Sequence, residues 1–294
     1  MEQFIQLILS GVLVGGIYAA MAMGFVLIFK ATGVINFAVG EIVMLGAFFA
    51  LVFTSIEILP IWVAIALTLG VTMVLGMGIE RIFLRPLIGQ PVMSSVMMTI
   101  ALSSFLASIG ILIWGYTTAA LPTIVPEGSV SVAGTNLSYE HIFGFTIAMV
   151  SVGVLTYVFQ RTKIGLRMRA SAEEHFVAQS VGIDVKKIFG LIWGLSALVC
   201  AVSGIVLGNL YGVSAGLAVV GLKVLPIVIL GGMDSILGCI VAGILIGVLE
   251  NFVALYIDPL VGGGMVEVFP FIVMIVILIF KPTGLFGTKR IERV

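Results

Sequence analysis

The sequence consists mainly of apolar runs, several of them close to the length that crosses a bilayer as a helix, which is about 20 residues. Hydrophobic residues make up 61% of the chain and charged residues 10%; soluble domains have roughly 25% charged residues. The mean hydropathy is +1.30. A soluble fold would have to surround this apolar content with almost no polar shell. The sequence therefore predicts an all-α polytopic membrane protein.

The apolar runs divide residues 1–294 into predicted spans of a single transmembrane domain. We expect eight full transmembrane helices: Phe4–Phe29, Phe37–Thr54, Leu59–Glu80, Val92–Trp114, Glu140–Gln160, Ile188–Leu210, Ser235–Tyr256 and Phe269–Phe280. The first should be a retained helix, because no basic segment precedes it as in a signal peptide. Leu222–Gly232 is too short for a regular crossing and contains Pro226, which predicts a broken or re-entrant helix. Gly115–Tyr139 is predicted to be a loop.

One stretch, Arg161–Lys187, is the only long charged segment between apolar runs, and it holds six of the fourteen Lys and Arg residues. Lys and Arg accumulate in cytoplasmic loops of membrane proteins. If this stretch is cytoplasmic and the spans alternate, with the short segment Leu222–Gly232 counted as one crossing, thirteen of the fourteen basic residues are cytoplasmic and only Lys223 lies on the outer side. The predicted topology has the N-terminus outside and the C-terminus in the cytoplasm.

Glycines recur at a spacing of four residues in three of the predicted spans. The positions are Gly11 and Gly15; Gly204, Gly208 and Gly212; and Gly243 and Gly247. Small residues at this spacing let helix backbones approach closely. Glycine is common throughout membrane helices, so we expect these positions to serve packing within the chain rather than a dedicated dimer contact.

The basic stretch contains the signals of a short helix. Ser171 followed by Glu174 has the form of a capping box, with Ser171 as N-cap. Glu173 and Glu174 also suit the positive end of a helix dipole, and Gly182 is placed to end the helix in a left-handed conformation. The predicted helix, Ala172–Val181, displays the apolar residues Phe176, Val177, Ala178 and Val181. Because so short a helix is marginal in water, it should dock onto this protein's own helix ends or into a partner's groove, and the residues leave both open.

The sequence contains few signs of catalysis. It has no phosphate-binding loop of the G-x-x-x-x-G-K-[ST] type and no nucleophile elbow. His141 and His175 lack metal-ligand spacing, and Cys200 and Cys239 lie within apolar runs, where cysteines behave as small hydrophobes. The net charge is zero, which gives no electrostatic case for nucleic-acid binding. We therefore expect a chain that is not an enzyme and that binds no metal or cofactor.

Polar residues within the spans are the candidates for a transport path, because a charge inside the bilayer is costly unless it is paired or faces a cavity. Glu41 and Glu250 stand near the ends of two predicted spans, and their alternative role is that of an interfacial carboxylate or a cap. The scarcity of such residues argues against a proton-driven carrier. The candidate pathway residues are Asn36, Glu41, Asn209, Glu250 and Asn251.

Three stretches in the right order resemble one family of transporters. They are Gly11–Ala47, Arg169–Gly208 with RASAEEHFVAQSVGID near its start, and the Gly-rich Gly221–Gly247. Together they resemble the LivH-type permeases of bacterial ABC importers for branched-chain amino acids. Val39 stands where that family commonly has His, and Asp234 stands where it usually has Gly. Relatives of the same architecture are similar to transporters of urea, short amides and other small polar solutes, which is the alternative for the substrate.

The resemblance implies a fold similar to that of the large, vitamin B12-type importer permeases and a place in the bacterial inner membrane. It also implies partners: cytoplasmic subunits that bind ATP and Mg²⁺, a second identical or related permease, and a periplasmic substrate-binding protein. Arg161–Lys187 would be the coupling loop, contacting the ATPase through Ser171, Glu173, Glu174, Phe176, Val177, Ala178, Val181 and Gly182. The alternatives from other classes are a stand-alone channel or secondary carrier and a structural membrane protein. A broken short segment disfavours the last of these.

Overall fold

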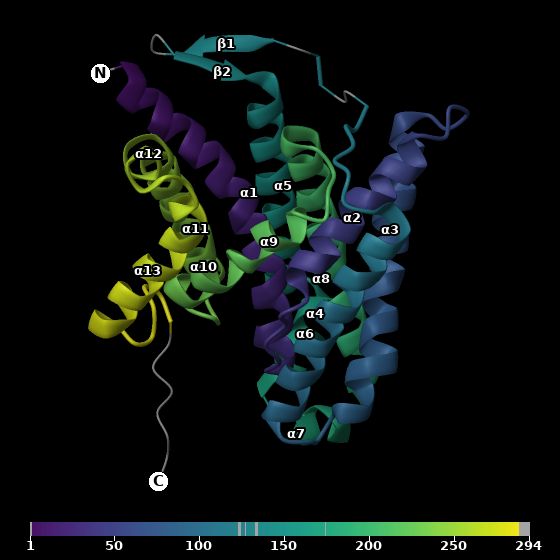
Figure 1. Cartoon of the computed structure of the whole chain (residues 1–294). Coiled ribbons are helices and arrows are strands. Elements are labelled where there is room, and N and C mark those ends of the chain that lie inside the picture. The colour runs from purple at the N-terminus through teal and green to yellow at the C-terminus, as the bar shows by residue number, and fades with distance from the viewer. Residues whose placement is uncertain (1, 123–124, 127, 133–134, 174, 288–294) are drawn as a thin grey trace.

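The computed structural model describes residues 2–122, 125–126, 128–132, 135–173 and 175–287 (Figure 1). The longer helices are α1 (Glu2–Thr32), α2 (Val39–Thr54), α3 (Ile61–Ile79), α4 (Val92–Trp114), α5 (Tyr139–Arg161), α8 (Val185–Tyr211), α11 (Ile236–Phe252) and α13 (Met265–Phe280). The short helices are α6 (Lys163–Glu173), α7 (His175–Ser180), α9 (Leu217–Leu222), α10 (Val224–Gly231) and α12 (Asp258–Val261). Three further turns are the π-helical η1 (Glu80–Leu84) and η3 (Val253–Ile257) and the 3₁₀ turn η2 (Arg85–Leu87).

The described part of the chain contains six helices that are long and apolar enough to cross a membrane. They are Gln3–Thr32, Ile61–Leu87, Val92–Trp114, Tyr139–Arg161, Val185–Tyr211 and Ile236–Val261. Three shorter apolar helices accompany them: Val39–Thr54, Leu217–Gly231 and Met265–Phe280. The helical membrane fold is as predicted, but the count of eight full spans is not confirmed. The helices α2 and α13 have 16 residues each, fewer than the roughly 20 that a full crossing needs.

The helices place the loops at two opposite ends of the molecule. The start of α1 and a β-hairpin lie at one end, which we call the hairpin end, and α7 lies at the other, the α7 end (Figure 1). One hydrogen bond joins the last turn of α1 to the α10–α11 link, from Lys30 Nζ to the Asp234 carbonyl at 3.1 Å. The hairpin, β1 (Ser129–Val132) paired antiparallel with β2 (Thr135–Ser138), lies within the predicted loop Gly115–Tyr139 and was not foreseen.

The basic residues follow this division. Ten lie at the α7 end: Lys30, Arg81, Arg85, Arg161, Lys163, Arg167, Arg169, Lys186, Lys187 and Lys281. Lys289, Arg290 and Arg293, which the predicted topology places on the same side, lie outside the described residues. Lys223 alone among the described basic residues is inside the helix bundle. The predicted separation of charge is therefore present in the fold, with Lys223 buried rather than in an outer loop.

The core is built around α1 and α8, which are buried over most of their length, while α3, α4 and α5 turn apolar side chains outward. Glycines bring α1 and α11 into backbone contact. A Cβ added at Gly247 would lie 2.6 Å from the Gly15 Cα, and one added at Gly11 would lie 2.5 Å from the Val248 Cα. Gly204 likewise packs against the backbone of α2 at Val43. The predicted role of these glycines in internal packing is confirmed.

Two helix breaks meet inside the bundle. The chain is non-helical between the end of α1 at Thr32 and the turn that opens α2 at Val39. The predicted short segment is interrupted at only one residue, because α9 ends at Leu222 and α10 begins at Val224, and Lys223 between them keeps right-handed helical dihedral angles. The backbones touch at this point, since a Cβ added at Gly221 would overlap the Cα of Gly40. Irregular backbone at membrane depth is tolerated where protein or a cavity surrounds it.

The substitution Gly247→Val should separate α1 from α11, because the new side chain would overlap the backbone at Gly15. Overpacking of this kind costs about 1–3 kcal/mol. The expected result is a lower thermal unfolding midpoint and aggregation in detergent, measured by differential scanning fluorimetry and size-exclusion chromatography. Gly153→Val is the matched control, since a Cβ at Gly153 meets nothing within 4 Å. Equal stability of the two variants would contradict the packing role.

Candidate functional site

A buried group of three polar side chains lies where the helix breaks meet. Lys223 Nζ lies 3.0 Å from Glu250 Oε1, and the Tyr18 hydroxyl donates a hydrogen bond of 2.9 Å to Glu250 Oε2. The three residues come from the α9–α10 break, from α11 and from α1, and they are only 7%, 4% and 4% exposed. We call Tyr18, Lys223 and Glu250 the central cluster.

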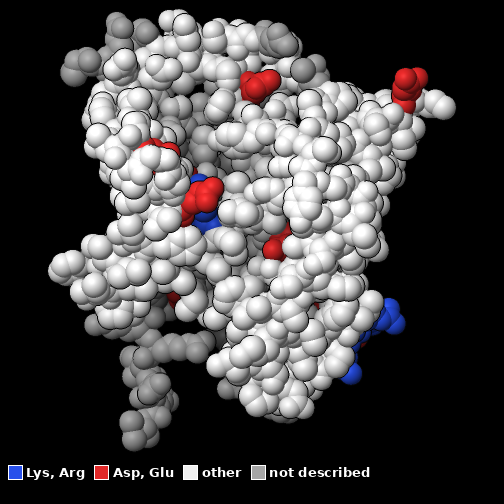
Figure 2. All heavy atoms as spheres, in the orientation of Figure 1, with Lys and Arg blue, Asp and Glu red and all other residues white. Residues whose placement is uncertain are grey.

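The central cluster is deep in the membrane part of the protein. Tyr18 lies near the middle of the 31-residue helix α1, about 24 Å from its first residue at a rise of 1.5 Å per residue. The Lys223 ammonium lies 5.9 Å from the centre of the Tyr18 ring and so at a similar depth. Figure 2 shows a recess at about half the height of the molecule in which acidic and basic groups lie side by side. Charges at this depth persist in proteins when they are paired or face a water-filled cavity.

A cavity of about 480 Å³, lined by both polar and apolar side chains, lies between α1, α5, α8 and α11 at the hairpin end. Its polar lining residues are Gln3, Gln6, Ser10, His141, Tyr211 and Asn251. We call it the outer cavity. It is far larger than the roughly 10–15 Å³ of such volume that admits one water molecule. The helix α11 carries both Asn251, on the cavity wall, and its neighbour Glu250, in the central cluster.

The predicted pathway residues do not form one site. Glu250 belongs to the central cluster, and Asn251 at the outer cavity bonds through Nδ2 to the Leu7 carbonyl at 3.1 Å. Asn36 and Glu41 lie at the α1–α2 break, where both are buried. Asn209 instead lines a separate apolar cavity between α3, α5 and α8.

The two residues at the α1–α2 break have polar atoms left over. Asn36 Oδ1 accepts a hydrogen bond of 3.0 Å from the Ala38 amide, and Glu41 Oε1 accepts one of 2.6 Å from the Ser103 hydroxyl. Within the described residues, Asn36 Nδ2 and Glu41 Oε2 are buried without a hydrogen-bond partner. Asn36 thus caps the turn that opens α2. The unmade bonds show that this break retains polar capacity next to α9.

Sequence reasoning missed Tyr18 and Lys223. The apolar pattern gives no reason to single out a tyrosine in the middle of a span. Lys223 did leave a signal, because it was the one basic residue that the predicted topology stranded on the outer side. A basic residue that breaks the charge rule within an apolar segment is a functional candidate by default.

The basic stretch forms two helices, α6 and α7, that pack against the α7 ends of α1, α5 and α8. Met168 and Ala178 are buried in this contact, whereas Val181 is 73% exposed. The segment therefore docks onto this protein's own helix ends. Val181, one of the predicted apolar contact residues, stays exposed. Glu174 lies outside the described residues, as do the side chains of Glu173, Phe176 and Val177.

The predicted start of the short helix is wrong. Ser171 is not an N-cap but a buried residue within α6, which begins at Lys163. Thr162 takes the capping position instead, since its Oγ1 accepts a hydrogen bond of 3.1 Å from the Gly165 amide. A Ser with an acidic residue three positions later does not by itself start a new helix when the residues before it are already helical.

The predicted end of the helix is confirmed. Gly182 has φ +84, its amide bonds to the Gln179 carbonyl, and the Ile183 amide bonds to the Ala178 carbonyl, both at 3.0 Å. This pair of bonds is the Schellman arrangement. It leads directly into α8, where the Asp184 carboxylate caps the helix by accepting a hydrogen bond of 3.2 Å from the Lys187 amide.

Cations on two elements hold the segment in place. The Lys30 ammonium lies 5.5 Å from the centre of the Phe159 ring, and the Arg169 guanidinium lies 5.8 Å from it. Arg169 also donates a hydrogen bond to the Phe159 carbonyl. Contacts of cations with an aromatic ring face are attractive at these distances. They tie α6 to the last turns of α1 and α5.

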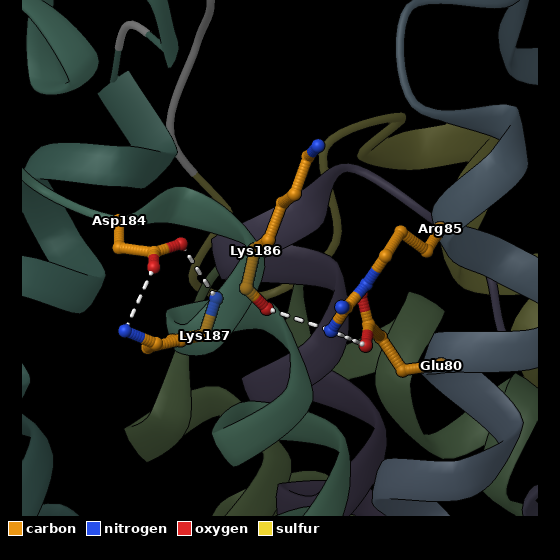
Figure 3. A network of polar contacts seen from close by, with 5 residues as sticks. All are labelled: Glu80, Arg85, Asp184, Lys186 and Lys187. Atoms are coloured by element: carbon orange, nitrogen blue, oxygen red, sulfur yellow. Dashed lines mark hydrogen bonds and ion pairs between the residues drawn. The ribbon is translucent and has the colours of Figure 1, made fainter.

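An arginine clamp joins the α3–α4 link to the start of α8 (Figure 3). Arg85 bonds the Glu80 carboxylate twice, with Nε 3.2 Å from Oε1 and Nη2 2.7 Å from Oε2. Its Nη2 also donates a hydrogen bond of 3.3 Å to the Lys186 carbonyl. Glu80 is 1% exposed and opens the π-helical turn η1. The clamp links α3 to the point where the α6–α7 segment enters α8.

The cap at Asp184 depends on pH, whereas the arginine of the clamp does not. The hydrogen bond from the Lys187 amide lowers the pKa of the exposed Asp184 carboxyl below its ordinary value. The cap is therefore present above the ordinary pKa and is lost as the pH falls through the lowered one. Arginine is charged at any physiological pH, so the Arg85 side of the clamp stays cationic over the range in which the Asp184 cap is lost.

The described residues hold no group of three or more His, Cys, Asp or Glu side chains that could bind a metal ion. The chemistry that these sites offer is recognition by charge and by hydrogen bonds. The central cluster offers a buried cation and anion, and the outer cavity offers uncharged polar side chains. The α6–α7 segment offers an exposed apolar side chain at Val181.

The substitution Arg85→Met should destabilise the α7 end, because it leaves the buried Glu80 carboxylate without its partner. An unsatisfied buried group of this kind costs about 1–3 kcal/mol, and more when it is charged. The measurement is the thermal unfolding midpoint of the purified protein. Arg81→Met is the control, since Arg81 is exposed on the same turn. Addition of Glu80→Gln to Arg85→Met should recover part of the loss, and failure to recover any would contradict the pairing argument.

Comparison with known proteins places the chain in a family. A sequence profile of the family described as "Branched-chain amino acid transport system / permease component" matches residues 7–278. The chain is 32% identical to the high-affinity branched-chain amino acid transport system permease protein BraD of Pseudomonas aeruginosa, over 99% of this chain and 98% of BraD. It is 26% identical to the corresponding LivH protein of Escherichia coli K12, over the same shares.

A solved structure supports the fold. The structure of PsaBC from Streptococcus pneumoniae in complex with Fab matches with a TM-score of 0.52 and 13% identity, covering 95% of this chain and 91% of that chain. At this identity the likeness concerns the fold alone. The profile match over most of the chain confirms the resemblance to LivH-type permeases found in the sequence. The chain belongs to the family of branched-chain amino acid transport system permease components.

Proposed function

We propose that the chain is the transmembrane permease subunit of an ABC importer for branched-chain or other hydrophobic amino acids. The observation that carries this proposal is the family match over residues 7–278. The relatives BraD and LivH, named as branched-chain amino acid permeases, align over nearly their whole length. In this proposal the chain itself is not an enzyme, and ATP and Mg²⁺ are bound by separate subunits.

The proposed orientation follows from the charges. Every described Lys and Arg except Lys223 lies at the α7 end, and basic residues favour the cytoplasmic side. The α7 end then faces the cytoplasm of a bacterial inner membrane, and the N-terminus and the hairpin face outward. The outer cavity opens on the side where a periplasmic binding protein would deliver substrate.

The α6–α7 segment is the proposed contact with the ATP-binding subunits. It projects at the α7 end (Figure 1), is anchored on three membrane helices, and presents the exposed apolar side chain of Val181. A short helix with a free apolar residue suits a groove on a partner. Ser171, Ala178 and Gly182 would support this contact from within, and a second permease would complete the membrane part.

We expect uptake of leucine, isoleucine and valine into proteoliposomes only when the permease is reconstituted with its ATP-binding subunits and binding protein, with ATP inside. The measurement is accumulation of labelled leucine against a concentration gradient. The permease alone should transport none, because the described residues include no phosphate-binding loop and few buried titratable groups.

Two outcomes would contradict this expectation. Transport by the permease alone would favour a channel or a secondary carrier. Failure of leucine, isoleucine and valine to raise the melting temperature of the binding protein, with a rise in urea or a short amide, would reassign the substrate to a small polar solute.

The substitution Val181→Glu should weaken binding of the ATP-binding subunits, because it places a charge where an apolar side chain would enter a groove. Hot-spot residues of interfaces contribute at least about 2 kcal/mol, or roughly 30-fold in affinity. The measurement is co-purification of the subunits with the tagged permease, together with uptake. Val261→Glu makes the same change at the exposed end of α12 on the opposite face and should leave co-purification intact. Equal co-purification of both variants would remove Val181 from the contact.

A further inference from the structure

We propose that the Lys223–Glu250 pair recognises the α-carboxylate and α-ammonium groups of the substrate as it passes the middle of the membrane. In this arrangement the Lys223 ammonium receives the carboxylate, and the Glu250 carboxylate receives the ammonium. Tyr18 positions Glu250 through the hydrogen bond from its hydroxyl. The inference rests on the proposed function, since it concerns an amino acid as the transported solute.

The charge pattern of the substrate class defines what such a site must offer. A free amino acid carries one positive and one negative charge on adjacent groups, and both lose water in the bilayer interior. Each of them then needs an opposite charge, because an unpaired ion at this depth is costly. A pair of opposite charges on the protein can accept a zwitterion between them, so that one ion pair becomes two and no charge is left alone.

The central cluster is the one place in the described residues that offers this. Three ion pairs are present: Glu80–Arg85, Asp184–Lys187 and Lys223–Glu250. The Asp184–Lys187 pair is exposed, the Arg85 side chain of the first pair is partly exposed, and both pairs lie at the α7 end. Only Lys223 and Glu250 are both buried, with side chains 9% and 6% exposed.

The outer cavity provides the approach. Val14 on α1 and Ala254 beyond the end of α11 line it. Tyr18 follows Val14 by four residues and Glu250 precedes Ala254 by four, so each lies on the same helix face as its cavity residue. Both helices thus present the central cluster about one turn deeper than the cavity wall. The volume of about 480 Å³ lies within the range of small-molecule sites, about 300–1,000 Å³.

The helix interruptions place the pair where the solute sites of transporters commonly lie. Discontinuous helices are the usual place for solute sites near the middle of the membrane. At Lys223 itself the main chain stays hydrogen-bonded, with its amide donating to the Val220 carbonyl and its carbonyl accepting from the Ile227 amide, so the polar groups on offer there are side chains. Here the end of α9 and the start of α2 touch through Gly221 and Gly40, next to Lys223. The recess with adjacent charges in Figure 2 lies at this height.

A purely structural pair is the competing explanation, and a neutral double variant separates the two. Glu250→Gln or Lys223→Met alone strands a buried charge and should impair folding in either case. The double variant Glu250→Gln/Lys223→Met removes both charges and leaves none uncompensated, so it should assemble. If the pair only holds helices together, the double variant transports; if it recognises the substrate, the double variant does not.

The experiment uses the complete importer in proteoliposomes with leucine as the probe. We expect the double variant to assemble with the ATP-binding subunits like the native protein, yet to take up leucine at least about tenfold more slowly, since truncated buried charge contacts cost this much or more. Glu267→Gln, which removes an exposed acid near the hairpin end of α13, should transport normally. Leucine uptake by the double variant within about twofold of native would overturn the proposal.

A second measurement tests the charges of the ligand directly and does not need the binding protein. Leucine should raise the melting temperature of the purified native permease–ATPase complex, whereas 4-methylpentanoate, which lacks the ammonium, and 3-methylbutylamine, which lacks the carboxylate, should not. The double variant should show no leucine shift. Equal shifts in native and double variant, or equal shifts by all three compounds, would overturn the proposal.

The two measurements also keep this inference separate from the proposed function. If the native importer does not take up leucine at all, the proposed function fails. If it does so while the double variant transports leucine and keeps the native leucine shift, only the site assignment fails.

Discussion

The cost of placing charge in a bilayer organises this molecule. The described chain keeps its basic residues at one end of the helix bundle, and the single exception, Lys223, is paired with Glu250 and backed by Tyr18. A lone ammonium at that depth would be expelled or would thin the membrane around it. The pair therefore fixes how α1, α11 and the α9–α10 break must lie, because each contributes one of its groups. The packing of these elements keeps the Lys223 ammonium paired with the Glu250 carboxylate inside the bundle.

Close backbone packing makes this arrangement possible. Gly11, Gly15, Gly243 and Gly247 allow α1 and α11 to touch along their length, which brings Tyr18 within hydrogen-bonding reach of Glu250. A second close approach, Gly40 against Gly221, brings the two helix breaks together. Without side chains at these positions the helices gain van der Waals contact, which drives association in a medium that offers no hydrophobic force. The same glycines thus stabilise the bundle and position its polar centre.

Local signals in the sequence predicted much of the fold. Apolar runs placed the helices, the basic stretch predicted the charge separation, and Gly182 marked the end of α7, since each depends on neighbouring residues. The errors have physical reasons. Two predicted full spans, α2 and α13, are too short for a full crossing. The hairpin was missed because its stability depends on pairing between β1 and β2, which the composition of a loop does not predict. Ser171 lies inside a helix that starts at Lys163, because a weak cap cannot interrupt a helix that tertiary contacts already hold.

The polar centre could be predicted only in part for a different reason. Glu250 stood out as a carboxylate in an apolar run, but its partners are 27 and 232 positions away in the sequence, and no local pattern joins them. Asn36, Glu41 and Asn209 were equally plausible from composition, yet they lie at other places in the fold. Lys223 differs from them because it is the one basic residue that the rule of cytoplasmic Lys and Arg did not place in the cytoplasm. A residue that violates a strong constraint marks a site more clearly than one that merely fits a chemical type.

The two functional ends of the molecule are joined by α8. At the α7 end, the Schellman turn at Gly182 and the clamp of Arg85 on Glu80 fix the direction in which α8 leaves the α6–α7 segment. Along its length α8 packs on α1, α2 and α3, and α2 begins at the break beside Lys223. The α6–α7 segment is therefore connected through one continuous helix to α1 and α2. The helix α1 carries Tyr18 of the central cluster, and α2 begins next to the α9–α10 interruption at Lys223.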